Sequence, residues 1–264
     1  MRIALGISYS GSAYEGWQSQ LSGKTVQDKL ELALSKFSVQ PVRVMCAGRT
    51  DAGVHALMQV VHFDTPLQRE TASWVRGTNA FLPSDIAVQW AQAVPDEFHS
   101  RASAVARRYA YVVLESPVRP SVEAGRVGWV YRPLDGDAMR QAAQFLLGEH
   151  DFSSFRAAQC QAKSPVKTIN RIEISQRSGN GSGYWRFEFE ANAFLHHMIR
   201  NIMGCLLAVG QGHQPPKWLA EVVVARRRAA AAPTFSPDGL YFLGPVYEER
   251  YGLPRQTAAY DWLP

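Results

Sequence analysis

Hydrophobic and polar residues alternate with a period of two in several short stretches of the chain. The first stretch, Arg2–Tyr9, places Ile3, Leu5 and Ile7 on one face, which is typical of a half-buried β-strand. Similar or continuously apolar stretches predict further strands at 42–47, 57–63, 85–94, 105–114, 167–177, 184–191 and 240–247. A turn rich in Gly, Asn and Ser at 178–183 joins two of these strands into a predicted hairpin.

Between these strands, apolar residues recur with the helical period of three to four. Thr25 can cap a first helix. The apolar stripe of that helix consists of Val26, Leu30, Leu34 and Phe37. Further helices are predicted at 69–80, 135–147, 195–209 and 215–227. Asp135 supplies the cap of the second of these four, and Gly148 ends it.

The order of the predicted elements indicates the fold class. The first hundred residues alternate β-α-β-β-α-β, which is the order of a ferredoxin-like split βαβ unit with an antiparallel sheet. A related pattern begins again at residue 104. We therefore predict an α+β protein of two ferredoxin-like (RRM-like) halves with mainly antiparallel sheets. The predicted domains are residues 1–103, and residues 104–264 with the final strand and tail.

Composition narrows the class of protein. The chain has 264 residues, of which 46% are hydrophobic and 19% are charged, as in a globular protein with a sizeable core. A net charge of +5 mildly favours a polyanionic partner. The three cysteines are too few and too far apart for a disulfide framework. Without an apolar run of membrane-spanning length or a signal-peptide layout, we expect a cytoplasmic protein.

A short glycine-bounded stretch carries the strongest candidate chemistry. Residues 48–55 (GRTDAGVH) lie between two predicted strands and contain one carboxylate, Asp51, two residues after one guanidinium, Arg49. On an extended backbone these two side chains leave from the same face. A carboxylate kept ionised by an arginine is a plausible nucleophile or base. The alternative is an Asp that hydrogen-bonds its own turn and pairs loosely with a surface Arg.

The second half of the chain offers two further candidates. Tyr109 follows Arg107 and Arg108 on a predicted strand, where aromatic residues usually belong to the core but can also stack on a base. Arg200 lies in an otherwise apolar helix, so either a carboxylate elsewhere pairs with it or it reaches solvent. The histidines lack metal-ligand spacing, and no glycine-rich nucleotide loop is present, so we expect no metal and no cofactor.

Taken in order, several stretches of the chain resemble the tRNA pseudouridine synthase A family almost from end to end. They are YSGSAYEGWQ (9–18), GRTDAGVH (48–55), RRYAY (107–111), KSPVKTI (163–169), FLHHMIRN (194–201) and GLY (239–241). The resemblance implies two domains that flank a central basic active-site cleft. It also implies isomerisation of uridine to pseudouridine at positions 38, 39 and 40 in the anticodon stem-loop of tRNA, without a cofactor, by a homodimer.

The resemblance also implies a role for each candidate residue. Asp51 would be the catalytic aspartate, and Arg49 would help to extrude the target nucleotide. Tyr109 would stack on the uracil, and Arg200 would pair with Asp51. Whether Asp51 attacks the sugar, attacks the base or removes a proton stays open at this point. Two rival classes also remain, namely a non-catalytic RNA-binding module and a metal-assisted RNA hydrolase that uses the histidines.

Overall fold

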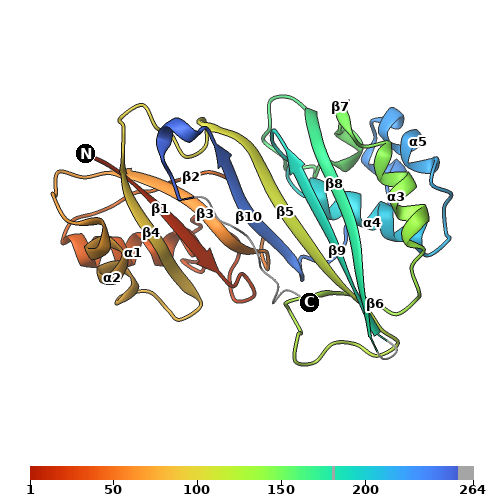
Figure 1. Cartoon of the computed structure of the whole chain (residues 1–264), viewed down its shortest axis with the longest axis horizontal. Coiled ribbons are helices and arrows are strands. Elements are labelled where there is room, and N and C mark those ends of the chain that lie inside the picture. Colours follow the sequence, from red (N-terminus) through yellow and green to blue (C-terminus); the bar gives the residue numbers. More distant parts are fainter. Residues whose placement is uncertain (180–181, 255–264) are drawn as a thin grey trace. The chain divides into compact units, whose positions relative to one another are not determined.

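A computed structural model describes residues 1–179 and 182–254, without the side chains of 178, 179 and 182 (Figure 1). The chain divides into two compact units. One consists of Met1–Arg107 and the described residues from Tyr241 onward, and the other of Arg108–Leu240. The predicted boundary near residue 103 stays a prediction, because compactness does not show which parts fold independently.

The strands of the first unit are built around β1 (Arg2–Tyr9). It lies between β4 (Ile86–Val94) and β3 (His55–Asp64) and is antiparallel to both. On its other side, β3 pairs with the short antiparallel strand β2 (Met45–Cys46) and with the parallel strand β10 (Leu240–Tyr247). The first four strands therefore have the order β4-β1-β3-β2.

Two helices pack together in this unit. Thr25 caps α1 (Val26–Ser38), and its side-chain oxygen accepts a hydrogen bond from the Asp28 amide. The ring of Phe37, near the end of α1, lies 5.3 Å from the ring of Trp74 in α2 (Thr71–Asn79). Trp74 in turn packs edge-on against Phe63 of β3, so burial of these rings joins both helices to the strands.

In the second unit the strands follow the order β5-β9-β8-β7. Their bounds are Ala104–Glu115 for β5, Ser182–Ala191 for β9, Val166–Gly179 for β8 and Gly148–Asp151 for β7. Strands β8 and β9 form the predicted antiparallel hairpin, in which Ile172 lies opposite Phe189. Residues 180 and 181 of its predicted turn fall outside the described residues. The three-residue strand β6 (Gly128–Val130) pairs in parallel with β5.

The described residues of the second unit also form the helices α3 (Gly136–Gln144), α4 (Met198–Gly210) and α5 (Trp218–Ala225). Asp135 caps α3 as predicted, because its side chain accepts a hydrogen bond from the Ala138 amide at 2.9 Å. Short 3₁₀ turns occur at Ser153–Phe155, Arg228–Ala230 and, in the first unit, Glu249–Tyr251. The predicted α+β class with mainly antiparallel pairing is confirmed. No helix in the described parts of the chain is long and apolar enough to cross a membrane.

Some predicted bounds are wrong for local reasons. The strand predicted at 42–47 shrinks to β2, because the amides of Val42 and Val44 bond to the Ser35 and Glu31 side chains of α1. The helix predicted from residue 195 begins at Met198, after His197 in a left-handed conformation. The helices predicted at 135–147 and 215–227 are shorter at their ends. Strands β6 and β7 were not predicted, because they are short and have little apolar periodicity.

Candidate active site

The loop between β2 and β3 carries Arg49 and Asp51 in the first unit. Arg49 is exposed, Thr50 is buried with 7% of its surface accessible, and Asp51 is half-buried. Burial therefore alternates along these three residues, as it does when neighbouring side chains leave an extended backbone on opposite sides. The loop turns back at Gly53, whose φ of 80° lies in the left-handed region that favours glycine.

The buried side chains of Gln59 and Tyr9 hold this loop through hydrogen bonds. The amide of Gln59, on β3, donates to the Gly48 carbonyl at 2.5 Å and accepts from the Gly48 amide at 3.4 Å. The Thr50 hydroxyl shares a 2.7 Å hydrogen bond with the Tyr9 hydroxyl at the end of β1. Burial raises the pKa of Tyr9, although hydrogen bonds from Thr50 and Gln59 act in the opposite direction. The Tyr9 hydroxyl therefore stays protonated at neutral pH.

The segment after β1 lies directly against the loop. The Trp17 amide donates to the Thr50 carbonyl at 3.0 Å, and the Gly11 amide donates to Nδ1 of His55 at 3.1 Å. A Cβ at Gly11 would lie 2.0 Å from the Val54 carbonyl oxygen, so only glycine fits there. The stretches 9–18 and 48–55 are far apart in sequence, but hydrogen bonds join them side by side in the first unit.

His55 closes the loop on its other end. Its ring stacks on the ring of Tyr241 from β10, with centroids 4.6 Å apart and planes 20° from parallel. Tyr241 lies opposite His55 in the parallel pairing of β10 with β3. Tyr241, the last residue of the GLY stretch at 239–241, therefore lies beside the end of the loop at 48–55.

Tyr109 and Arg200 belong to the second unit. Tyr109, on β5, is 8% exposed, and its ring meets Phe194 edge-on at 5.2 Å. Tyr111 is fully buried beside Phe235, so it is a core residue. Arg200, on α4, is half-buried, and its Nε donates to the Phe235 carbonyl at 2.9 Å. The Phe235 carbonyl thus accepts one hydrogen bond from the Arg200 guanidinium, for which the sequence shows no acidic partner nearby.

Several arginines whose charge could serve contacts with phosphates have partners within the protein. Arg107 donates to the carbonyls of Ala104 and Arg101. Arg226 pairs with Asp151, with Nε and Oδ2 3.5 Å apart. Arg228 bonds the Thr234 hydroxyl at 3.0 Å, whereas Arg227 has an exposed side chain. Two of the three arginines at 226–228 therefore already have partners within the second unit.

Sequence reasoning located Arg49 and Asp51 but missed the residues beneath them. Thr50 is the one hydroxyl residue of 48–55, and Gln59 is the uncharged polar residue inside the apolar run of β3. A buried polar residue in an apolar strand needs a hydrogen-bond partner, so Gln59 was a detectable signal. Its partner could not be named without the fold.

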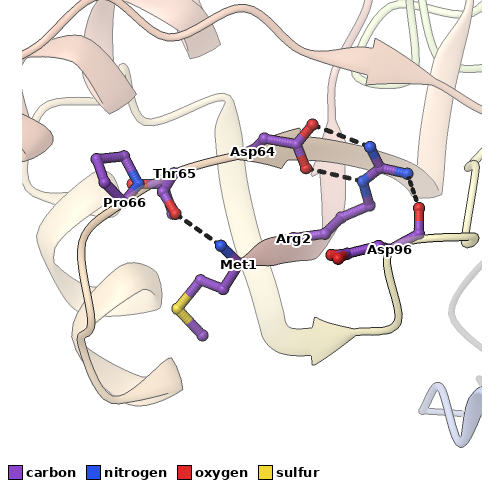
Figure 2. A pocket seen from close by; sticks show the side chains of 6 residues that line it. All are labelled: Met1, Arg2, Asp64, Thr65, Pro66 and Asp96. Carbon is purple, nitrogen blue, oxygen red and sulfur yellow. Dashed lines mark hydrogen bonds and ion pairs between the residues drawn. The ribbon is translucent and has the colours of Figure 1, made fainter.

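A pocket of about 480 Å³ opens at the start of β1, away from this loop (Figure 2). It is lined by Met1, Arg2, Asp64, Thr65, Pro66 and Asp96. Arg2 makes two hydrogen bonds to the Asp64 carboxylate, at 2.8 and 2.9 Å, and further bonds to the Asp96 and Phe98 carbonyls. The Met1 amino group donates to the Thr65 carbonyl. The charges of Arg2 and Asp64 satisfy each other, and backbone carbonyls accept the other bonds of Arg2 and Met1, which is typical of a structural network.

Comparison with known proteins shows the family of the chain. The sequence profile described as tRNA pseudouridine synthase matches residues 6–101 and 142–248. A protein named tRNA pseudouridine synthase A from Polaromonas naphthalenivorans (strain CJ2) is 91% identical over 264 residues and the full length of both chains. The protein of that name from Paracidovorax citrulli (strain AAC00-1) is 70% identical, again over all of both chains.

Similarity to solved structures is distant. The structure titled "Crystal Structure of a Cbf5-Nop10-Gar1 Complex" has a TM-score of 0.34 and 13% identity, over 78% of this chain and 45% of that chain. The identification therefore depends on the sequence relatives. On the matched segments and the full-length identities, the chain belongs to the tRNA pseudouridine synthase family and is an isomerase.

Proposed function

We propose that this isomerase converts uridine to pseudouridine at positions 38, 39 and 40 of the tRNA anticodon stem-loop, with Asp51 as its catalytic nucleophile or base. The observation that carries the proposal is the anchored loop, in which buried Thr50 separates exposed Arg49 from half-buried Asp51. Asp51 is the only carboxylate of residues 48–55. The names of the full-length relatives support the reaction on tRNA.

The reaction is an isomerisation that needs no redox partner. The bond from C1′ of the ribose to N1 of uracil breaks, the base turns, and a bond from C1′ to C5 forms. The proton on C5 leaves and N1 gains a proton, so the atoms balance without a cofactor. Asp51 could attack the sugar, attack the ring or remove a proton. In each case it must be ionised and held against a base that has left its stack.

Family resemblance suggests the partners of Asp51. Arg49 leaves the same loop and would help to extrude the nucleotide, whereas Tyr109 would stack on the uracil. Arg200 would pair with the Asp51 carboxylate and favour its ionised form. Arg200 lies on an apolar helix, where an arginine needs hydrogen-bond acceptors, and this supports the role.

The proposal includes the finer architecture and the assembly. We propose two ferredoxin-like halves, because the β4-β1-β3-β2 order of the first unit is that of a split βαβ unit. A homodimer that works in the cytoplasm and binds the tRNA through a basic cleft is proposed from the resemblance. Recognition of adjacent uridines in different sequences would depend on RNA shape more than on base identity.

The test uses tRNA transcripts labelled with tritium at C5 of uridine, because formation of the new bond releases the C5 hydrogen. Asp51→Ala and Asp51→Asn should abolish release under single-turnover conditions while tRNA affinity stays within a few-fold. Asp135→Asn is the matched control, since Asn also caps a helix and α3 lies in the other unit. Wild-type release should persist in excess chelator.

Appreciable single-turnover release by Asp51→Ala would overturn the assignment of Asp51. Absence of release by the wild-type protein would favour a non-catalytic RNA-binding module. Loss of release in chelator would favour the metal-assisted alternative. Transcripts with cytidine at positions 38, 39 and 40 carry the label only at other uridines and should release no tritium. Release from these transcripts would contradict the proposed target positions.

A further inference from the structure

We propose that Thr50 and Gln59 are positioning residues for the isomerisation, because they fix the backbone on both sides of Arg49 and so set the place of Asp51. This inference rests on the proposed role of Asp51. It concerns only residues of the first unit, all within 1–107.

The Gln59 side chain fixes the first point of the loop. It is fully buried on β3, and its amide meets both backbone groups of Gly48. Gly48 lies beyond the end of β2, so a side-chain amide of β3 bonds its backbone groups in place of the backbone of that strand. A buried amide that satisfies both groups resists displacement, because moving it would leave polar groups unpaired.

Thr50 fixes the second point. Its hydroxyl bonds to the Tyr9 hydroxyl at 2.7 Å, and its carbonyl accepts from the Trp17 amide at 3.0 Å. The Tyr9 and Trp17 rings lie 5.9 Å apart, so the two contacts come from one packed pair. A Cβ at Gly16 would lie 2.7 Å from the Thr50 carbonyl oxygen, which shows how closely the backbones approach there.

The two fixed points lie next to the candidate catalytic residues. Hydrogen bonds hold Gly48 and Thr50, which flank Arg49, and Asp51 directly follows Thr50. With Gly48 and Thr50 fixed, the loop has little freedom to translate the Asp51 carboxylate. A misplacement of about 1 Å in a reacting group can cost about a hundredfold in rate. Loosening either point should therefore lower the rate of the chemical step much more than the affinity for tRNA.

The test separates positioning from ordinary stability. Thr50→Val, Tyr9→Phe and Gln59→Met each remove hydrogen bonds from the loop with little change in volume. Two variants elsewhere in the first unit make the same substitutions. Thr78→Val removes a fully buried hydroxyl of α2 that has no hydrogen-bond partner in the described part of the chain, so it controls for the substitution alone. Tyr247→Phe removes a 2.5 Å bond from a tyrosine hydroxyl to the Ser100 carbonyl, so it controls for the loss of a hydrogen bond.

Single-turnover tritium release at saturating enzyme gives the rate constant, and filter binding gives the Kd for tRNA. Thr50→Val and Gln59→Met should lower the rate about tenfold to a hundredfold, with Kd within about twofold. Thr50→Ser keeps the hydroxyl and should restore the rate to within about threefold of wild type. Thr78→Val and Tyr247→Phe should stay within about twofold in rate, even where they lower the melting temperature.

A double-mutant cycle keeps the inference testable where Gln59→Met does not fold. Because Tyr9 and Thr50 share one bond, the double variant should lose no more rate than the worse single variant. Folded Thr50→Val and Tyr9→Phe proteins with wild-type rates would overturn the inference. Asp51→Asn in the same assay distinguishes the failures. If it is active, the proposed role of Asp51 is wrong, and if it is inactive beside fast loop variants, only the positioning role is wrong.

Discussion

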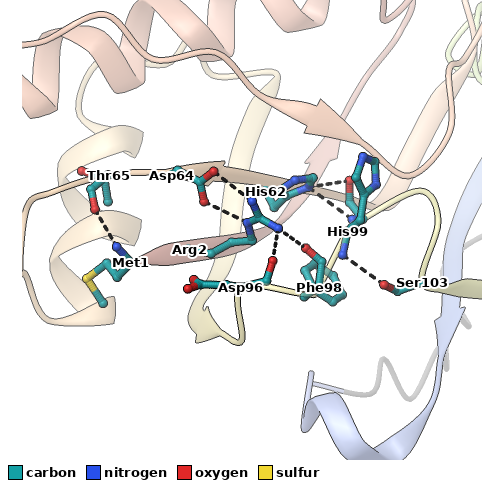
Figure 3. A network of polar contacts seen from close by, with 10 residues as sticks. Met1, Arg2, His62, Asp64, Thr65, Asp96, Phe98, His99 and Ser103 are labelled. Atoms are coloured by element: carbon teal, nitrogen blue, oxygen red, sulfur yellow. Dashed lines mark hydrogen bonds and ion pairs between the residues drawn. The ribbon is translucent and has the colours of Figure 1, made fainter.

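His62 makes the stability of the first unit depend on pH (Figure 3). This histidine of β3 is 5% exposed, and its Nδ1 accepts a hydrogen bond from the Ser100 amide at 3.2 Å. Burial lowers the pKa of His62 to about 4, and the nearby positive charges of His99 and Arg2 act in the same direction. The carboxylate of Asp64 opposes them. The native state therefore holds this imidazole neutral.

The size of the effect follows from the two pKa values. In the unfolded chain the pKa of a histidine is about 6.5, so between pH 6.5 and 4 the unfolded state binds a proton that the native state does not. Stability is complete above pH 6.5, falls as the pH decreases, and levels off below about 4. At about 1.4 kcal/mol per pH unit the full loss is about 3 kcal/mol, and about 2 kcal/mol is lost by pH 5.

The assay is urea unfolding at pH 7 and pH 5. His62→Asn keeps an acceptor near the position of Nδ1 but cannot bind a proton, so its loss between these pH values should be smaller than wild type by about 2 kcal/mol. Asp64→Asn is the control. Arg2 lowers the pKa of the Asp64 carboxyl, so that group stays ionised between pH 7 and pH 5. Because its charge raises the pKa of His62, its removal should not make the loss of stability smaller than in wild type. Equal losses in wild type and His62→Asn, or an NMR titration of His62 near pH 6.5, would refute the reasoning.

Three further predictions concern a helix cap, a turn and the partner. Thr25→Ala should destabilise the protein by about 1 kcal/mol, and Thr25→Ser should not, because the hydroxyl caps α1; urea midpoints measure both. Gly239→Ala should cost several times more than Gly212→Ala in the same assay. Both glycines have positive φ, but a Cβ at Gly239 would lie 2.2 Å from the Val112 oxygen, whereas Gly212 has open space. Affinity for tRNA should fall log-linearly with salt, and a flat dependence in filter binding would contradict binding through phosphates.

Local signals predicted the regular elements well. The alternation in Arg2–Tyr9 gave the strand with its observed bounds, and Thr25 and Asp135 cap their helices as expected. The strand predicted at 42–47 failed because its amides bond to side chains of α1, a contact that periodicity does not encode. His197 adopts a left-handed backbone that nothing in its residue type requires.

The candidate site was predicted in part. The roles of Asp51 and Arg49 stay predictions, but both were candidates because a carboxylate between glycines at a strand end is a local feature of the sequence. The residues that hold them, Tyr9 and Gln59, act through bonds across 41 and 11 positions of the chain. The pair of Gln59 with Gly48 depends on the register of β2 with β3, in which Cys46 lies opposite Val61 and the Ala47 amide bonds to the Val60 carbonyl. Register is a property of the folded sheet, so the sequence alone did not predict these contacts.

The strand β10 makes completion of the first unit a late event in synthesis. The loop at 48–55 leaves the ribosome early, but His55 at its end stacks on Tyr241, nearly two hundred residues later. Until β10 emerges, one side of β3 lacks this partner, and Phe98 lacks its packing against Tyr247 and Tyr251. N-terminal segments of a nascent chain fold first where they can. This protein instead ties the loop at 48–55 to β10, so a nascent or truncated chain that ends before β10 lacks the stacking of His55 on Tyr241.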